Sequence, residues 1–186
     1  MKMTEAQFQK SIERGELQLS TVGKFNHWSP IFFLLLVPVV ILISIAVSII
    51  SQHSFHISQA ELRIIIIPSV LSLLIYLVQK RRLKFKIITT TLSQPEILKI
   101  IKQVSKDLNW IPGTHSANTF IATTNPGFFS GSWGEQITIL FDGNQIFVNS
   151  VCNPQDRPSL ASFGRNRNNM KTLLNRITEA NQVEIG

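Results

Sequence analysis

The chain has 186 residues, a formal net charge of +7 and a single cysteine, Cys152, which excludes a scaffold held by intrachain disulfides. Residues 80–86 carry five positive charges and no negative one, whereas residues 87–186 carry eight basic and seven acidic side chains. The basic excess therefore marks one boundary in the chain, and it argues against a generally basic domain that binds nucleic acid.

Residues 1–28 are expected to form a cytoplasmic N-terminal arm. Thr4 and Gln7 have the spacing of a capping box, which predicts a short helix with Phe8 and Ile12 one turn apart and an end near Gly15. This arm has mixed charge, and no small-residue cleavage pattern follows the next apolar run, so a cleavable signal peptide is a poor explanation.

Residues 29–80 predict a hairpin of two membrane-spanning helices at about 29–51 and 62–79. Residues 31–50 contain no charge and are long enough to cross a bilayer. The second apolar run, residues 64–78, reaches spanning length only if Arg63 extends toward the interface. The alternatives are a re-entrant or interfacial second segment, and a buried hairpin of a soluble protein.

The flanks of this hairpin predict its orientation. Glu61 balances Arg63 in the connecting loop while both flanks are basic, so the positive-inside rule places both termini in the cytoplasm. Trp28 and Tyr76 are expected at the membrane interface. The basic residues of the boundary, expected to attract anionic headgroups of the lipid bilayer or simply to fix topology, are Lys80, Arg81, Arg82, Lys84 and Lys86.

Residues 83–186 predict a cytoplasmic α+β domain. Alternation from Leu83 to Thr90 predicts a strand, and a capping box from Ser93 to Glu96 predicts a helix that follows it. Short strands are expected at residues 109–111 and 118–123, with a turn at Pro112-Gly113. Residues 137–141, 142–144 and 145–151 predict a β-hairpin, and an apolar stripe from Met170 to Ile177 predicts a closing helix.

The predicted order is therefore strand, helix, four strands, helix. An antiparallel sheet with both helices on one face is the simplest arrangement of these elements. The order resembles that of the TATA-binding-protein-like fold, but the likeness concerns topology alone, and we do not transfer DNA binding to a domain with a net charge near zero.

Three short segments carry a resemblance at the level of residues. They are Ser132-Trp133-Gly134-Glu135, Val148-Asn149-Ser150 and Phe163-Gly164-Arg165-Asn166. These segments are similar to "SWGE", "VNS" and "FGRN" elements in an uncharacterised, Bacteroidetes-like family of small two-helix bacterial membrane proteins. The resemblance covers roughly residues 85–180 and implies a multi-pass protein of the bacterial inner membrane, without an activity. Residues 157–169 have a fainter similarity to the DUF1499 proteins, which also implies no reaction.

The entrance to the last helix is the first candidate site. Free backbone donors at a helix start favour anions, and arginine adds forked donors for phosphate or carboxylate. The candidate residues are Arg157, Ser159, Ser162, Gly164, Arg165, Asn166 and Arg167. A lipid headgroup, a nucleotide or an acidic peptide would fit there. Alternatively, Ser162 caps the helix while Arg165 and Arg167 are solvated.

The glycine-rich loop at residues 125–134 is the second candidate site. Phe128, Phe129 and Trp133 are expected either to form a tip that binds a partner or inserts into the membrane, or to fold back over the open face of the sheet. Trp110 and Cys152 are expected to be ordinary buried residues.

No catalytic arrangement is recognisable in the sequence. His53 and His56 have no third metal ligand nearby, and the acidic residues form no acid/base pair, so neither a metal nor another cofactor is expected. We expect a non-enzymatic, membrane-anchored protein whose cytoplasmic domain docks another protein or assembles with itself. The alternative is a binder of an anionic ligand at the cluster of residues 157–167.

Overall fold

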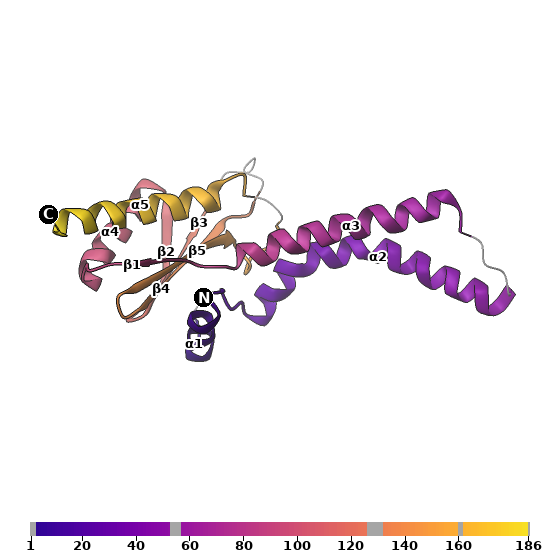
Figure 1. Ribbon diagram of the computed structural model, residues 1–186, viewed down its shortest axis with the longest axis horizontal. Helices are drawn as coiled ribbons and strands as arrows, with labels where there is room; N and C mark the ends of the chain where they lie inside the picture. Colours follow the sequence, from indigo (N-terminus) through magenta and orange to yellow (C-terminus); the bar gives the residue numbers. More distant parts are fainter. Residues whose placement is uncertain (1–2, 53–56, 126–131, 160–161, 186) are drawn as a thin grey trace. The chain divides into compact units, whose positions relative to one another are not determined.

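The computed structural model describes residues 3–52, 57–125, 132–159 and 162–185 (Figure 1). The chain divides into two compact units. One consists of His27–Arg81, and the other combines Met1–Asn26 with Arg82–Gly186. The second unit is therefore built from sequence on both sides of the apolar segments.

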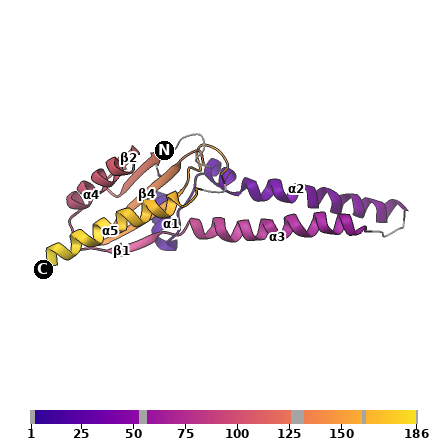
Figure 2. The same ribbon diagram turned by 90° about the horizontal axis from the view of Figure 1, so that it is seen from above.

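The first of these units is made by α2 (Thr21–Gln52) and α3 (Gln59–Arg82), which run side by side in opposite directions (Figures 1 and 2). Both helices are long enough and apolar enough to cross a bilayer. α2 begins before the expected span of 29–51 and continues through Pro30 and Pro38. Proline is tolerated in such helices because neighbouring groups can satisfy the freed backbone carbonyls.

Polar and aromatic contacts join α2 to α3 at one end of the hairpin. His27 Nε2 lies 3.1 Å from the carbonyl oxygen of Gln79, and the Gln79 side-chain amide donates to the carbonyl of His27 at 3.4 Å. The Trp28 and Tyr76 rings pack together with their centroids 5.4 Å apart. The two aromatic residues expected at the interface thus lie at the same end of the hairpin.

The second unit contains a five-stranded antiparallel sheet. Its strands are β1 (Lys86–Thr89), β2 (Trp110–Ser116), β3 (Thr119–Thr124), β4 (Glu135–Asp142) and β5 (Gln145–Cys152), and their order across the sheet is β1-β5-β4-β3-β2. α4 (Gln94–Asp107) follows β1, and α5 (Arg165–Ile185) follows β5. The predicted order of strand, helix, four strands and helix is confirmed.

The hairpin of β4 and β5 is also confirmed. Asp142 pairs with Gln145 across a two-residue turn, and Gly143 has a φ of 56°, in the left-handed region that glycine adopts without steric cost.

The predicted turn at Pro112-Gly113 is wrong. Both residues lie within β2, and the chain reverses at Ala117-Asn118 instead. β2 is an edge strand, where a proline that lacks an N–H need not remove a ladder hydrogen bond. The register shift between Pro112 and His115 is a local irregularity of the kind that bulges produce at sheet edges.

α4 and α5 cover one face of the sheet, as predicted (Figures 1 and 2). Ile101 of α4 and Leu173 and Ile177 of α5 are fully buried. They pack against alternate strand residues, among them Phe120, Ala122, Ile137, Ile139, Phe141, Ile146 and Val148. The period of two along each strand therefore directs these side chains to the helices.

The N-terminal segment covers the other face of the sheet. α1 (Glu5–Arg14) has the predicted Thr4–Gln7 capping box and ends at Gly15. The side chains of this segment in the second core are Met3, Phe8, Leu17 and Leu19, and they pack with Phe85, Ile121, Leu140, Phe147 and Val151. Residues 1–28 were expected to be an arm, but their first part is a layer of the domain.

The capping box of α4 gives a prediction for pH. The Glu96 carboxylate accepts hydrogen bonds from the Ser93 hydroxyl at 2.5 Å and the Ser93 amide at 2.8 Å, and these bonds lower the pKa of Glu96 below 4.5. A lowered folded-state pKa stabilises the fold above pH 4.5, and this contribution disappears as the pH falls through the folded-state value. In Ser93→Ala we expect the Glu96 pKa to rise toward 4.5, measured by carboxyl NMR titration. An unchanged pKa would show that the hydroxyl has no such role.

Candidate functional site

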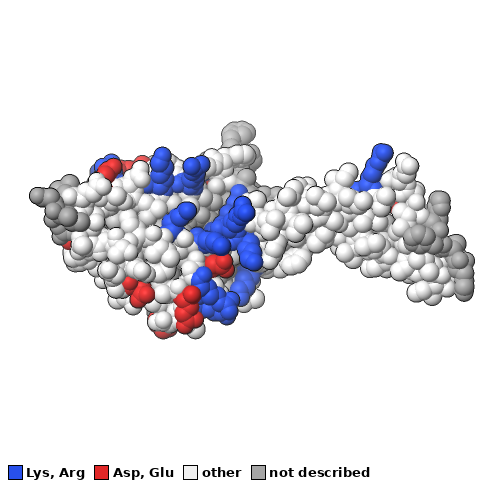
Figure 3. All heavy atoms as spheres, in the orientation of Figure 1, with Lys and Arg blue, Asp and Glu red and all other residues white. Residues whose placement is uncertain are grey.

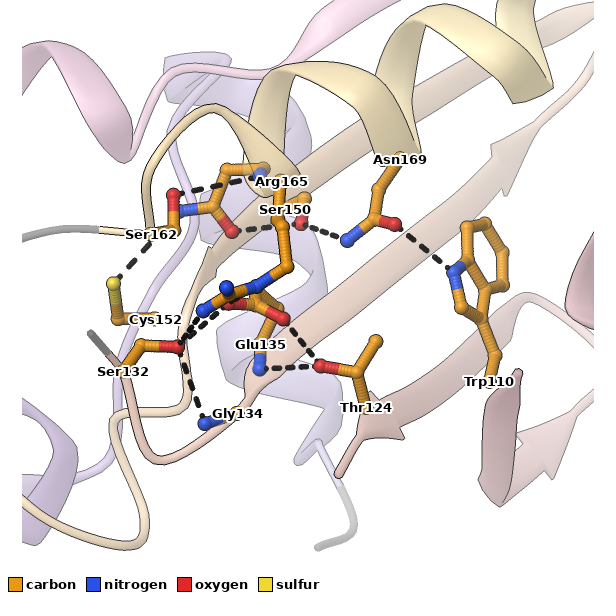
Figure 4. Close-up of polar contacts among 11 residues, drawn as sticks. Trp110, Thr124, Ser132, Gly134, Glu135, Ser150, Cys152, Ser162, Arg165 and Asn169 are labelled. Atoms are coloured by element: carbon orange, nitrogen blue, oxygen red, sulfur yellow. Dashed lines mark hydrogen bonds and ion pairs between the residues drawn. The ribbon is translucent and has the colours of Figure 1, made fainter. Parts of the chain in front are cut away.

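An ion pair with a buried carboxylate joins the first residue of β4 to the start of α5 (Figure 4). The side chain of Glu135 is completely buried, and its Oε1 accepts from Arg165 Nε at 2.8 Å. Ser132 Oγ donates to the same carboxylate oxygen at 2.6 Å and accepts from the Arg165 guanidinium at 2.6 Å. The Thr124 hydroxyl donates to Oε2. The carboxylate is thus paired on both oxygens, which is what a buried charge requires.

A second network of hydrogen bonds lies beneath α5 (Figure 4). Trp110 Nε1 donates to Asn169 Oδ1 at 3.1 Å, and Asn169 Nδ2 donates to Ser150 Oγ at 3.2 Å. Ser150 in turn donates to Asn166 Oδ1 at 3.0 Å. Asn166 Nδ2 lies 3.9 Å from the buried Cys152 sulfur. The predicted core positions of Trp110 and Cys152 are confirmed.

The three segments of the family resemblance meet in these two networks. Ser132 and Glu135 come from the first segment, Ser150 from the second, and Arg165 and Asn166 from the third. The sequence interpretation treated them separately and missed the partnership of Glu135 with Arg165. One signal was available, because Glu135 lies on the same side of its strand as Ile137 and Ile139, and a charge in such a position needs a buried partner.

The candidate anion cluster is divided by this arrangement. Arg165 is only partly exposed and is not free, because its guanidinium is bound to Glu135 and Ser132. Ser162 and Asn166 are buried, and Ser162 Oγ accepts a hydrogen bond from the backbone N–H of Asn166 at 3.4 Å. Gly164 has a φ of 85° directly before the helix. Ser159 is half-buried, and only Arg157 and Arg167 have exposed side chains among the three arginines of the cluster.

Two aromatic side chains close in sequence to the residues of the ion pair are exposed, since Trp133 follows Ser132 and Phe163 lies two positions before Arg165. Trp133 is 50% exposed, and the Arg157 guanidinium lies 4.5 Å from the centroid of its ring. Phe163 is 77% exposed and has a φ of 43°. We call Trp133, Arg157 and Phe163 the aromatic platform. Trp133 does not fold over the second face of the sheet, since the N-terminal segment covers that face. Phe128 and Phe129 lie outside the described residues.

The loop that carries Arg157 is held by the beginning of α2. Asn26 Nδ2 donates to the carbonyl of Pro154 at 3.0 Å, and Gln155 Nε2 donates to Ser20 Oγ at 3.0 Å. Residue 31, where the long apolar run begins, follows Asn26 by only a few positions. The aromatic platform is therefore linked to the segment that leads into the first apolar helix.

The basic boundary begins in the last turn of α3 and continues just after it. Lys80, Arg81, Lys84 and Lys86 are exposed, and Arg82 is half-buried at the end of α3. Lys84 forms a β-bridge with Glu16. On the face drawn in Figure 3, basic side chains gather where α3 gives way to β1, whereas the visible surface of the two apolar helices is almost uncharged.

We expect Asn169→Ala to lower the free energy of unfolding by about 2 kcal/mol, because it leaves the Trp110 N–H unsatisfied and deprives Ser150 of a donor in a buried place. Asn168→Ala is the matched control, since Asn168 is the exposed neighbour on the same helix. Urea unfolding of the full chain in detergent, followed by circular dichroism, gives both values. Equal values for the two variants would contradict the role assigned to Asn169.

Within the part of the chain that the structure describes, no group of three or more His, Cys, Asp or Glu side chains could hold a metal ion. No known family model matches the chain, and neither a curated protein nor a solved structure shows significant similarity to it.

Proposed function

We propose that the chain is a multi-pass protein of the bacterial inner membrane with both termini in the cytoplasm. In this proposal α2 and α3 anchor a non-enzymatic α+β domain that docks a protein partner through the aromatic platform. The length and apolar composition of the two helices support the anchor. The basic residues at the end of α3 and just after it support the orientation. The TATA-binding-protein-like order of elements remains an analogy of topology and adds nothing to the function.

The exposure of Trp133 and Phe163, which are close in sequence to the residues of a buried ion pair, is the observation that carries the proposal. Tryptophan and arginine are the residue types that dominate binding energy at protein interfaces. The hydrogen bonds among Ser132, Glu135 and Arg165 restrain the backbone next to Trp133 and Phe163. A partner would meet a surface that is already ordered, so association would cost less conformational entropy.

Docking through a free edge of the sheet is less well supported. β1 is only four residues long. β2 contains Pro112 and a register shift, both of which hinder pairing with an added strand. Self-assembly by edge-to-edge pairing is therefore disfavoured, and we place the contact at the platform.

The test is photo-crosslinking in intact membranes, with p-benzoylphenylalanine incorporated at position 133. Position 111 is the matched control, because Ile111 is 52% exposed and Trp133 is 50% exposed in the same domain. We expect one protein adduct of constant mass from position 133 and none from position 111. Phe163→Ala should reduce the adduct at least severalfold. Adducts to lipid alone, or identical adducts from both positions, would refute the proposal.

A second candidate function is the binding of an anion by Arg157 and Arg167, whose side chains are exposed. Calorimetric titration of the detergent-solubilised full chain with inorganic phosphate and with ATP tests it. Binding that is lost in Arg157→Gln/Arg167→Gln would favour this function, whereas unchanged binding in the double variant would exclude these two side chains.

A further inference from the structure

We propose that a groove between α4 and the strands β2 and β3 binds a single-chain amphiphile with an anionic head, such as a fatty acid or a lysophospholipid. The groove has a volume of about 420 Å³ and lies entirely within the α+β domain, away from the residues of the aromatic platform. This volume lies in the range of small-molecule sites in proteins. The inference does not depend on the docking function proposed above.

The wall of the groove suits an apolar tail. Leu98, Trp110, Pro112 and Phe120 are among the residues that line it. The indole N–H of Trp110 donates to Asn169, and the ring has no other polar group, so Trp110 presents only apolar surface to the groove. An apolar chain placed here would be removed from water on several sides, which is the main source of affinity for such ligands.

One polar group in the groove has no partner. Ser105 is 6% exposed, and among the residues that the structure describes its Oγ has no hydrogen-bond partner. A buried hydroxyl without a partner is rare in folded proteins because it loses its bonds to water. Ser105 lines the groove, and its hydroxyl is closed off from water, so a head-group oxygen could accept a hydrogen bond from it once the side chain rotates toward the groove.

The charge of the groove specifies an anion. Lys102 and Lys106 line it from successive turns of α4, and both are exposed. Neither forms an ion pair within the described ranges, while the nearby Asp107 faces Arg176 at 4.0 Å. Two ammonium groups one turn apart repel each other slightly, and a negative head group between them would attract both and offset this repulsion. Apolar walls beneath two lysines are the complement of an acyl chain that ends in a carboxylate or a phosphate.

The experiment measures quenching of Trp110 in the full chain, in neutral detergent. Trp28→Phe and Trp133→Phe leave Trp110 as the sole tryptophan in this background. The probe is 9,10-dibromostearate, whose bromine atoms quench nearby indoles, and its methyl ester is the uncharged control. Competition with palmitate and with lysophosphatidylglycerol distinguishes a fatty acid from a lysophospholipid.

We expect saturable quenching by the acid and only linear, micelle-dependent quenching by the ester. Lys102→Gln/Lys106→Gln should weaken apparent binding at least tenfold, and Ser105→Ala should weaken it severalfold. Lys99→Gln is the matched control, because Lys99 is exposed on α4 but does not line the groove, and it should change nothing. Identical quenching curves for acid and ester, or equal binding in the double-lysine variant, would overturn the proposal.

Discussion

Arg165→Ala is expected to lower the free energy of unfolding by about 3 kcal/mol, because it leaves the carboxylate of Glu135 buried without its counterion. The Arg165 side chain is 31% exposed, which places the expected loss at the lower end of the range for buried pairs. Arg167→Ala is the matched control, since Arg167 is exposed two positions further along α5 and should change stability by less than about 0.5 kcal/mol. Urea unfolding of the full chain in detergent gives both values.

A second variant separates the charge from the shape of the side chain. Glu135→Gln keeps the size of the residue. Its carbonyl oxygen can accept from one of the two hydroxyls, Ser132 or Thr124, and its NH2 group can donate to the other, but the buried negative charge is removed. We therefore expect Glu135→Gln/Arg165→Ala to be more stable than Arg165→Ala alone. If the double variant is the less stable of the two, the cost of the single change does not come from an unpaired charge.

Phe8→Ala is expected to cost about 3 kcal/mol, as the loss of a core aromatic side chain does in well-packed domains. Phe8 is buried in the second core, where Leu140 and Phe147 of the sheet are also buried. The change removes most of the apolar area by which α1 contributes to this layer. Thermal unfolding of the full chain, followed by circular dichroism, measures the effect.

Lys10→Ala is the control for Phe8→Ala, because Lys10 lies on the same helix and is exposed. It should leave the unfolding midpoint nearly unchanged. Equal midpoints for Phe8→Ala and the unaltered chain would mean that residues 3–19 are a loose arm and that the second face of the sheet is stable without them.

Local patterns predicted most elements of the fold. The capping boxes at Thr4 and Ser93, the β4–β5 hairpin and the stripe of α5 depend on residues close together in the chain, and each is present. The packing of α1 on the sheet depends instead on residues more than a hundred positions apart. Periodicity within a short window carries no information about such a contact. The sequence therefore predicts the helix α1 but not that it packs on the sheet.

The candidate site was only partly predictable for the same reason. The sequence indicates a cluster of arginines at the start of α5 and predicts that Arg165 binds an anion or faces solvent. In the structure Arg165 pairs with Glu135 instead. The alternation along β4 places the charge of Glu135 among core-facing residues. Such a charge needs a buried partner, but the alternation does not indicate which residue the partner is. The exposure of Trp133 depends on what already covers the sheet, and this is decided by the N-terminal segment.

The two-sided core has a consequence for how the chain can be threaded through a membrane. Side chains from residues 3–19 and from β4 and β5 share one core, so both stretches must lie in the same aqueous compartment when the domain folds. If α2 crosses the bilayer, α3 must bring the chain back, and the number of crossings is even.

The order of synthesis adds a second consequence. Phe8 and Leu17 are made first and have no sheet to cover until the last strands leave the ribosome. If α2 and α3 are inserted in a membrane, their insertion can precede completion of the domain, because both are made before β1–β5, and a stalled chain would expose the apolar side chains of residues 3–19.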